Sequence, residues 1–201
     1  MPAHTQEERR AETRARLIAA AADLFARKGF HAVSAEAVAD AADRTTGALY
    51  NHFRSKDGLL LALVEQWLDE SAARISADVE GAADLDGRLR ALWSDAMTPD
   101  PDDGDSWLLL EIELWLHAAR NAEFAGDLAR RYDDRRSDLA APVADWTEDE
   151  GLGRLRHPQR TSGLVIALLL GAAMQQRLDP NAFSAADVVA GLRALIEGDV
   201  S

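Results

Sequence analysis

The side chains whose spacing indicates chemistry lie between residues 44 and 56, in a run that carries tyrosine, histidine, lysine, asparagine and two threonines. Tyrosine, histidine and lysine donate hydrogen bonds to phosphate oxygens, and threonine and asparagine can bond to base edges. The sequence shows no nucleophile elbow, no phosphate-binding glycine loop and no paired-carboxylate pattern. The indicated chemistry is therefore non-covalent recognition of a polyanion rather than the making or breaking of bonds.

A helix-turn-helix would position these side chains. Ser34 can cap a short helix that runs through Ala41, residues 42–44 form the turn, and Thr45 can cap the second helix. On that second helix Leu49 and Phe53 turn inward. The outward side carries Thr46, Gly47, Tyr50 and Asn51.

Gly47 helps to decide whether the helix-turn-helix pattern serves DNA recognition or only the stability of the fold. A glycine inside a helix costs roughly 1 kcal/mol relative to alanine, so it fits best where another molecule approaches the backbone closely. The alternative is three helices that pack for stability alone, and it explains the inward positions. It does not explain a glycine beside exposed Tyr50, His52 and Lys56, so the sequence favours DNA binding.

The stretch from Gly29 to Leu59 resembles the DNA-binding region of TetR-family regulators, above all in its Gly-x-Leu-Tyr-x-His-Phe-x-Ser-Lys order. The resemblance implies an all-helical homodimer, usually a repressor, with a small-molecule pocket in the C-terminal domain. It places Arg44 and Leu49 beside the contacts in less defined roles. At Gly58 family members often have an acidic residue that completes a helix cap, so this departure predicts a weaker first turn. The DNA-contacting positions that the resemblance implies are Ser34, Thr45, Thr46, Gly47, Tyr50, Asn51, His52 and Lys56.

The charge distribution supports a division of the chain near residue 58. The net charge is −13, yet residues 1–58 carry nine Lys or Arg against eight Asp or Glu, and residues 59–201 carry thirteen against twenty-seven. Only the first segment can approach phosphates without strong repulsion. We therefore predict a helix-turn-helix DNA-binding domain at residues 1–58 and an effector-binding and dimerisation domain at residues 59–201.

The hydrophobic periodicity predicts an all-α protein. Pro142 marks a kink or a break in one of the longer helices, and Gly29 is the expected stop of the first. Two residues cap further elements: Thr45 begins the recognition helix and Ser55 begins the long one. The expected helices span residues 7–28, 34–41, 45–53, 55–80, 86–97, 106–120, 123–146, 159–178 and 184–197.

The expected helix 106–120 has two distinct faces. Glu111 lies among aromatic and aliphatic residues, where a carboxylate needs a partner or acquires a raised pKa. It either lines a pocket for a neutral or cationic effector or pairs with an arginine in the core. The opposite stripe carries His117, expected to be solvated or ion-paired. The predicted effector-binding residues are Trp93, Met97, Trp107, Glu111, Leu114, Trp115 and Phe124.

The two last helices predict a dimer interface. Helix 159–178 places Gly163, Ala167 and Gly171 four residues apart, which permits close helix approach, and its apolar residues are too numerous for one surface helix. With helix 184–197 it would form a four-helix bundle from two copies. The alternative is that both helices form intramolecular core.

Several classes of protein are disfavoured. There is no cysteine, so disulfides and thiolate metal sites are excluded, and the five histidines form no close-spaced metal pair. No leader pattern is seen, and the apolar run at residues 163–174 is shorter than the ~18–20 residues that a bilayer span needs. We expect a soluble cytoplasmic regulator without cofactor, metal, catalytic residues or membrane partner. An enzyme assembled from distant residues and a carrier of hydrophobic ligands remain alternatives.

Overall fold

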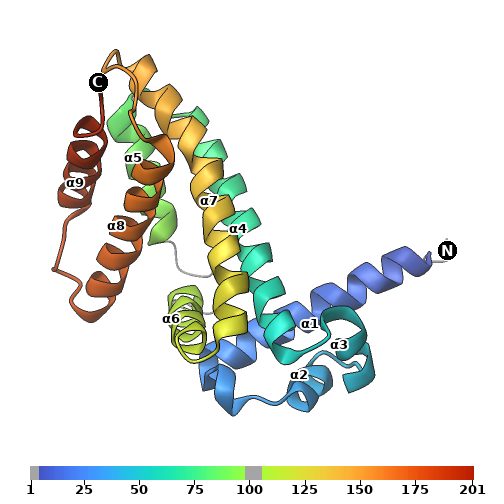
Figure 1. Ribbon diagram of the computed structural model, residues 1–201. Helices are drawn as coiled ribbons and strands as arrows, with labels where there is room; N and C mark the ends of the chain where they lie inside the picture. Colours follow the sequence, from blue (N-terminus) through green and yellow to red (C-terminus); the bar gives the residue numbers. More distant parts are fainter. Residues whose placement is uncertain (1–4, 98–105) are drawn as a thin grey trace. The chain divides into compact units, whose positions relative to one another are not determined.

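The computed structural model describes residues 5–97 and 106–201, and of residues 106 and 107 it describes the backbone alone. The first elements are α1 (Gln6–Lys28), the 3-10 turn η1 (Phe30–Ala32), α2 (Ala35–Ala41) and α3 (Thr46–Phe53) (Figure 1). The remaining helices are α4 (Lys56–Glu80), α5 (Leu85–Ala96), α6 (Ser106–Ala118), α7 (Ala122–Asp149), α8 (Pro158–Leu178) and α9 (Ala185–Glu197).

The chain divides into two compact units. The first consists of Met1–Asp69 and Pro99–Leu128, and the second of Glu70–Thr98 and Ala129–Ser201. Helices α4 and α7 each supply residues to both units. The division at residue 58 drawn from the sequence separates functions rather than packing units, and it stays a prediction.

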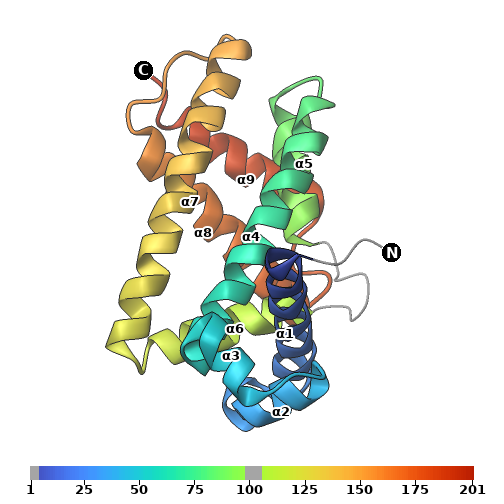
Figure 2. The ribbon, with the colours of Figure 1, turned by 90° about the vertical axis from the view of Figure 1, so that its right-hand side faces the viewer.

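In the first unit α1, α2 and α3 pack on one another and α6 packs against α1 (Figure 2). Helix α1 buries Leu17, Ile18, Ala21 and Phe25, which lie within about 100° of one another around the helix and so form a single face. Thr5 begins α1 with a capping box, and Gly29 ends it with a φ of 78°. The unit therefore has a core of its own to which the short helices α2 and α3 are fixed.

In the second unit α5, α8 and α9 pack together (Figures 1 and 2). Leu85 and Leu89 of α5 and Leu192 and Ile196 of α9 are fully buried in one cluster. At the edge of this cluster the guanidinium Nε of Arg193 donates to Asp86 Oδ1 at 2.6 Å. The apolar residues of the predicted helix 184–197 are thus mostly used within the protomer.

The end of the chain is tied to the start of α8. Leu155 and Val200 form an isolated antiparallel bridge, and Arg156 N donates to Asp199 O at 2.9 Å. The Asp199 carboxylate accepts from His157 N and from Thr161 Oγ1, both at 2.8 Å. Burial raises the pKa of Asp199, but the hydrogen bonds from His157 and Thr161 outweigh it, so the pKa is lowered overall. The carboxylate also stabilises the positive N-terminal end of α8.

The all-α expectation is confirmed, and the helix bounds agree closely with the predicted ranges. The largest difference is at α7, which continues to Asp149 instead of ending near Trp146. Of the kink or break predicted at Pro142, the break is wrong, because α7 is helical on both sides of the proline, and the kink stays a prediction. Val143 and Trp146 are buried in the core of the second unit, and that packing offsets the hydrogen bond lost at the proline.

In the part of the chain that the structure describes, no helix combines the length and the apolarity required to cross a membrane.

Candidate nucleic-acid interface

The turn between α2 and α3 is fixed by two backbone hydrogen bonds. Arg44 N donates to Ala39 O at 2.9 Å and Asp43 N donates to Asp40 O at 3.1 Å, the pattern of a Schellman motif. Asp43 takes the left-handed conformation there, with a φ of 53°. Aspartate tolerates this conformation better than most residues do, because its short side chain can bond locally. The turn sets the direction in which α3 leaves α2.

Helix α3 presents one exposed face. Thr45 Oγ1 accepts from Ala48 N at 3.1 Å and caps the helix, while Leu49 is fully buried beneath it. Tyr50 is 46% exposed, and Gly47 and Asn51 are also exposed. These last three residues follow the i, i+3, i+4 spacing of one helical face. The exposed face of α3 therefore carries three of the residues that the sequence assigned to DNA, Gly47, Tyr50 and Asn51.

Gly47 is not explained by packing within the chain. A Cβ built at Gly47 would meet only Thr45 Oγ1, at 3.8 Å, which is ordinary van der Waals contact. The chain therefore has room for alanine, the better helix former, and yet has glycine. The alternative of three helices that pack for stability alone offers no reason for this residue.

The hydroxyl groups of Ser34 and Thr45 serve as helix caps. Ser34 Oγ accepts from Ala37 N at 3.1 Å at the start of α2, as Thr45 does at the start of α3. A hydroxyl that accepts in this way retains its own proton for donation. Both residues are exposed, whereas Thr46 is half-buried.

Two predicted contact residues are engaged inside the unit. Leu49 has no exposed surface, so its predicted place at the interface is corrected: its side chain belongs to the core. The Arg44 guanidinium donates to Thr13 Oγ1 at 3.3 Å and to Asp43 O at 2.7 Å, and lies 3.7 Å from Glu12 Oε1. Arg44 thus ties the turn to α1, which leaves its role at DNA a prediction.

Lys56 is also tied to the protein. Its Nζ donates to Phe30 O at 2.9 Å and Val33 O at 2.8 Å and lies 4.2 Å from the centre of the Phe30 ring. Burial lowers the pKa of Lys56, and the adjacent Asp57 offsets part of that effect. Since an ammonium group has three donors, one remains for a phosphate. Lys56 holds the η1 segment against α4 whether or not it meets DNA.

His52 lies on the half-buried side of α3, near α1. Burial lowers the pKa of His52, and the positive charges of Arg10 and Arg14 on α1 lower it further. Arg14 also lies over the Phe53 ring, 5.7 Å from its centre. The helix-turn-helix motif does not include these two arginines, although their spacing of four residues places them on one face of α1.

The connection from α3 to α4 is a tight turn at Arg54. Ser55 N donates to Phe53 O at 2.8 Å across Arg54, whose φ is 65°. A Cβ at Gly58 would collide with the same Phe53 oxygen, and Gly58 N already donates to Ser55 Oγ at 2.9 Å. The turn at Arg54 thus favours glycine at position 58 of this chain, and the weaker first turn stays a prediction.

Asp57 of α4 and His117 of α6 make a contact that the sequence predicted only in part. His117 is buried, with Nε2 3.2 Å from Asp57 Oδ2, and Asn121 Nδ2 donates to the same oxygen at 3.3 Å. The rings of Phe30 and Phe124 lie 4.8 and 4.6 Å from the His117 ring. The expectation of a solvated histidine is wrong, and its alternative, a carboxylate partner, is what the structure shows. The helical spacing revealed the histidine's face but not this distant partner.

The predicted effector-binding residues are distributed over both units. In the first, Glu111 is 4% exposed and accepts from Trp115 Nε1 at 2.9 Å. Trp115 is half-exposed, whereas Leu114 and Phe124 are buried. In the second unit Trp93 is buried in the core and Met97 is exposed, and the Trp107 side chain lies outside the described part.

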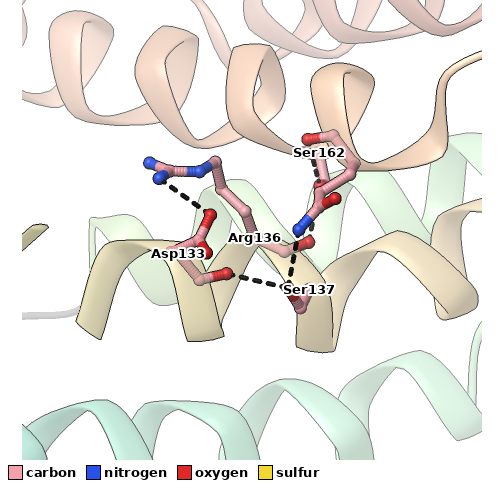
Figure 3. Close-up of polar contacts among 5 residues, drawn as sticks. Asp133, Arg136, Ser137 and Ser162 are labelled. Carbon is pink, nitrogen blue, oxygen red and sulfur yellow. Dashed lines mark hydrogen bonds and ion pairs between the residues drawn. The ribbon is translucent and has the colours of Figure 1, made fainter. Parts of the chain in front are cut away.

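The predicted dimer helices retain exposed apolar surface on α8. Leu164 and Leu178 are exposed, and a Cβ at Gly171 would meet nothing within 4 Å. Gly163 differs, because a Cβ there would lie 2.8 Å from Cδ of Arg136 on α7. Arg136 O also accepts from Ser162 Oγ at 2.7 Å, which joins α7 and α8 (Figure 3). The small residue at 163 therefore serves packing within the protomer.

Among the described residues no group of three or more histidine, aspartate and glutamate side chains is placed to hold a metal ion. The site consists of a capped helix with an exposed polar face, joined by a tight turn to a supporting helix. This combination defines a helix-turn-helix DNA-binding regulator.

The sequence comparisons identify the family. Residues 17–63 match the model of the bacterial regulatory proteins of the tetR family, and residues 86–199 match the model of the C-terminal region of BetI-type transcriptional repressors. The chain belongs to the TetR family of transcriptional regulators. The HTH-type transcriptional regulator UidR of Escherichia coli K12 is 26% identical over 186 residues, which is 92% of each chain.

Solved structures show the same fold. A TetR-family regulator from a Rhodococcus species has a TM-score of 0.75 at 24% identity, over 95% of this chain and 100% of that one. A transcriptional regulator from Saccharomonospora viridis, crystallised with choline, has a TM-score of 0.70 at 21% identity, over 94% and 98%. The family and these relatives are transcriptional regulators rather than enzymes.

Proposed function

We propose that this regulator is a repressor that binds a palindromic operator as a homodimer and is released by a small neutral or cationic effector. The observation that carries the proposal is the exposed face of α3, where Gly47, Tyr50 and Asn51 lie on a helix capped at Thr45. The match of the C-terminal region to a repressor model favours repression over activation.

The proposed contacts divide by chemistry. Thr46 and Asn51 are suited to base edges, while Tyr50 and His52 donate to phosphates and fix the register. Gly47 would let the backbone of α3 approach the DNA. Thr45 would donate its remaining hydroxyl proton to a phosphate at the start of α3, and Lys56 would donate its third ammonium proton. Ser34 would donate to a phosphate in place of its hydrogen bond to the Glu36 carboxylate.

The first test is selection of bound DNA from a random pool, followed by an affinity measurement with the Tyr50→Ala variant. We expect at least tenfold weaker operator binding with an unchanged fold, since a hydrogen bond to a charged group is worth about 1.5–3 kcal/mol. The control is Val33→Ala, which truncates a buried side chain outside the exposed face of α3. The DNA affinities of the two variants are compared at equal folded fraction. Equal binding by Tyr50→Ala contradicts the contact assignment, and no selected DNA favours a ligand carrier.

The proposed dimer uses the exposed apolar face of α8, with Leu164 and the open position at Gly171. Two recognition helices on a twofold dimer meet major grooves about 34–36 Å apart, so the operator should be palindromic. We expect Leu164→Asp to sediment as a monomer at micromolar concentration. Leu116→Asp, which is similarly exposed on α6, should remain dimeric. A dimeric Leu164→Asp variant contradicts this assignment.

The proposed effector site centres on Glu111 and Trp115. The half-exposed indole is suited to a cation–π contact, and the carboxylate one turn away favours a positive charge. Trp107, Leu114 and Phe124, which belong to the same unit, stay in the proposal as apolar lining residues, and the assignment of Trp93 and Met97 to effector binding stays a prediction. The regulator from Saccharomonospora viridis was crystallised with choline, a quaternary ammonium compound, which supports a cationic effector.

Choline serves as the probe for this site. The effector and the operator must weaken each other's binding by the same factor, because each acts only through different affinities for two states. We expect choline to release wild-type protein from its operator and Glu111→Gln to need about tenfold more, with unchanged DNA affinity. Glu123→Gln, at an exposed carboxylate of α7, is the control. An equal choline response in Glu111→Gln removes Glu111 from the site.

A further inference from the structure

The side of α1 that faces the end of α3 holds an excess of positive charge. Arg10 and Arg14 are both exposed and lie one helical turn apart. Among the described residues no carboxylate forms an ion pair with either, whereas Arg16 pairs with Glu12 at 2.7 Å on the same helix. Like charges four residues apart on a helix repel each other by a few tenths of a kcal/mol.

Arg14 lies against the last turn of α3, and Arg10 lies one helical turn before it on α1. The Arg14 guanidinium carbon lies 5.7 Å from the centre of the Phe53 ring, and the His52 ring is 5.8 Å from that same ring. The positive charges of both arginines act on His52. Two helices therefore bring together two permanent cations and one titratable ring.

We propose that Arg10, Arg14 and His52 form a clamp for a backbone phosphate of duplex DNA, beside the contacts made by the exposed face of α3. The assignment of Arg10 and Arg14 rests on the proposed DNA-binding function and adds α1 to it. A phosphate diester supplies the negative charge that the cluster lacks, and a guanidinium group matches its geometry. Because phosphate contacts carry no sequence information, the clamp sets register and affinity rather than specificity.

The test compares the Arg10→Gln/Arg14→Gln double variant with wild-type protein on the selected operator and on random-sequence duplex. The double variant should bind both DNAs about tenfold more weakly, and its slope of log K against log salt should fall by about 1 to 2. The matched control is Arg27→Gln/Lys28→Gln, which removes two charges at the other end of α1, where Arg27 pairs with Asp23. The control should keep the wild-type slope.

The possible outcomes distinguish failure of the phosphate clamp from failure of the proposed DNA-binding function. A double variant that is folded by circular dichroism and retains the wild-type affinity and slope overturns the clamp but leaves DNA binding intact. Wild-type protein that selects no DNA overturns the proposed function itself. Ten millimolar inorganic phosphate at constant ionic strength is the third arm. If it protects the wild type against thermal unfolding but not the double variant, and DNA binding is equal in both, the cluster binds free phosphate instead.

A pH series gives a second readout. The charged groups that act on His52 from α1 are Arg10 and Arg14, and both disfavour its protonation. A bound phosphate would favour the protonated ring, so DNA binding should take up a proton and weaken as the pH rises from about 6 to 8. His52→Gln should bind DNA with less dependence on pH. An identical pH dependence in wild type and His52→Gln removes His52 from the clamp.

Discussion

The region around α3 and the region around α8 use polar and small residues in opposite ways. Near α3, Ser34 and Thr45 cap helices with side chains that are also exposed, so the local fold and the proposed contacts involve the same atoms. Around α8, Ser162 Oγ donates to Arg136 O of the same chain (Figure 3). The Arg136 side chain also fills the space beside Gly163. The exposed surface there is apolar, at Leu164 and Leu178.

The difference shows which parts of such a protein a short motif can specify. Where a helix cap, a turn and a contact share one residue, the sequence restricts that position strongly. Where an interface consists of the apolar surface left after core packing, many sequences serve equally well. We therefore expect that substitutions near α3 can change DNA binding and stability independently of each other. Substitutions in α8 and α9 should likewise change dimerisation and stability independently.

The largest expected effect is that of Leu49→Ala. Leu49 has no exposed surface, and truncation of a buried leucine costs about 2–5 kcal/mol. Urea unfolding followed by circular dichroism should show this loss, and DNA binding should fall with the folded fraction. Leu192→Ala, at an equally buried position in α9, is the matched variant for the second unit. Unchanged stability with weaker DNA binding would instead place Leu49 at the interface.

The helices and the motif could be predicted from the sequence because their signals are local. Thr45 and Ser55 cap the helices to which the sequence assigned them, and Gly29 ends α1 as its position predicts. Helical periodicity separated buried Leu49 from exposed Tyr50. Local chemistry and spacing within about one turn were sufficient for these predictions.

The predictions that were wrong or incomplete depend on contacts that the spacing within one helix cannot show. Asp57 reaches His117 sixty residues away, and Lys56 reaches the carbonyl groups of η1, neither of which periodicity can show. Gly58 looked like a missing cap because the collision with Phe53 O depends on the turn at Arg54. Pro142 looked like a break because the packing of α7 cannot be read from its own residues.

The second largest effect is expected at Gly58. A side chain there must displace the Phe53 carbonyl, and overpacking of this kind costs about 1–3 kcal/mol. Gly58→Ala should therefore lower the urea midpoint and weaken DNA binding through the α3–α4 connection. Gly81→Ala is the matched variant, because a Cβ at Gly81 would meet only Asp78 O at 3.6 Å, and its urea midpoint should stay close to that of wild type. Equal midpoints for the two variants would contradict the described turn.

Asp199 provides a smaller effect that depends on pH. Its folded pKa lies below the unfolded value of about 3.8, so its carboxylate stabilises the fold above that pH and this contribution is lost as the pH falls through the folded pKa. Asp199→Asn should cost about 1 kcal/mol at pH 7, from weaker hydrogen bonds to His157 and Thr161. The difference in urea midpoint from wild type should shrink toward pH 3. A constant difference would show that the charge contributes nothing.

The smallest change in stability, at Gly47, distinguishes best between recognition and packing. Alanine fits there without a clash and is the better helix former, so Gly47→Ala should raise the free energy of unfolding by up to about 1 kcal/mol. The added methyl group would occupy the surface where DNA is proposed to approach, so operator affinity should fall while stability rises. Gly81→Ala, where a Cβ would meet only Asp78 O at 3.6 Å, is the control and should keep the DNA affinity of wild type. If Gly47→Ala binds the operator as well as wild type, the α3 backbone does not approach DNA at this position, and the glycine has no role that the exposed face explains.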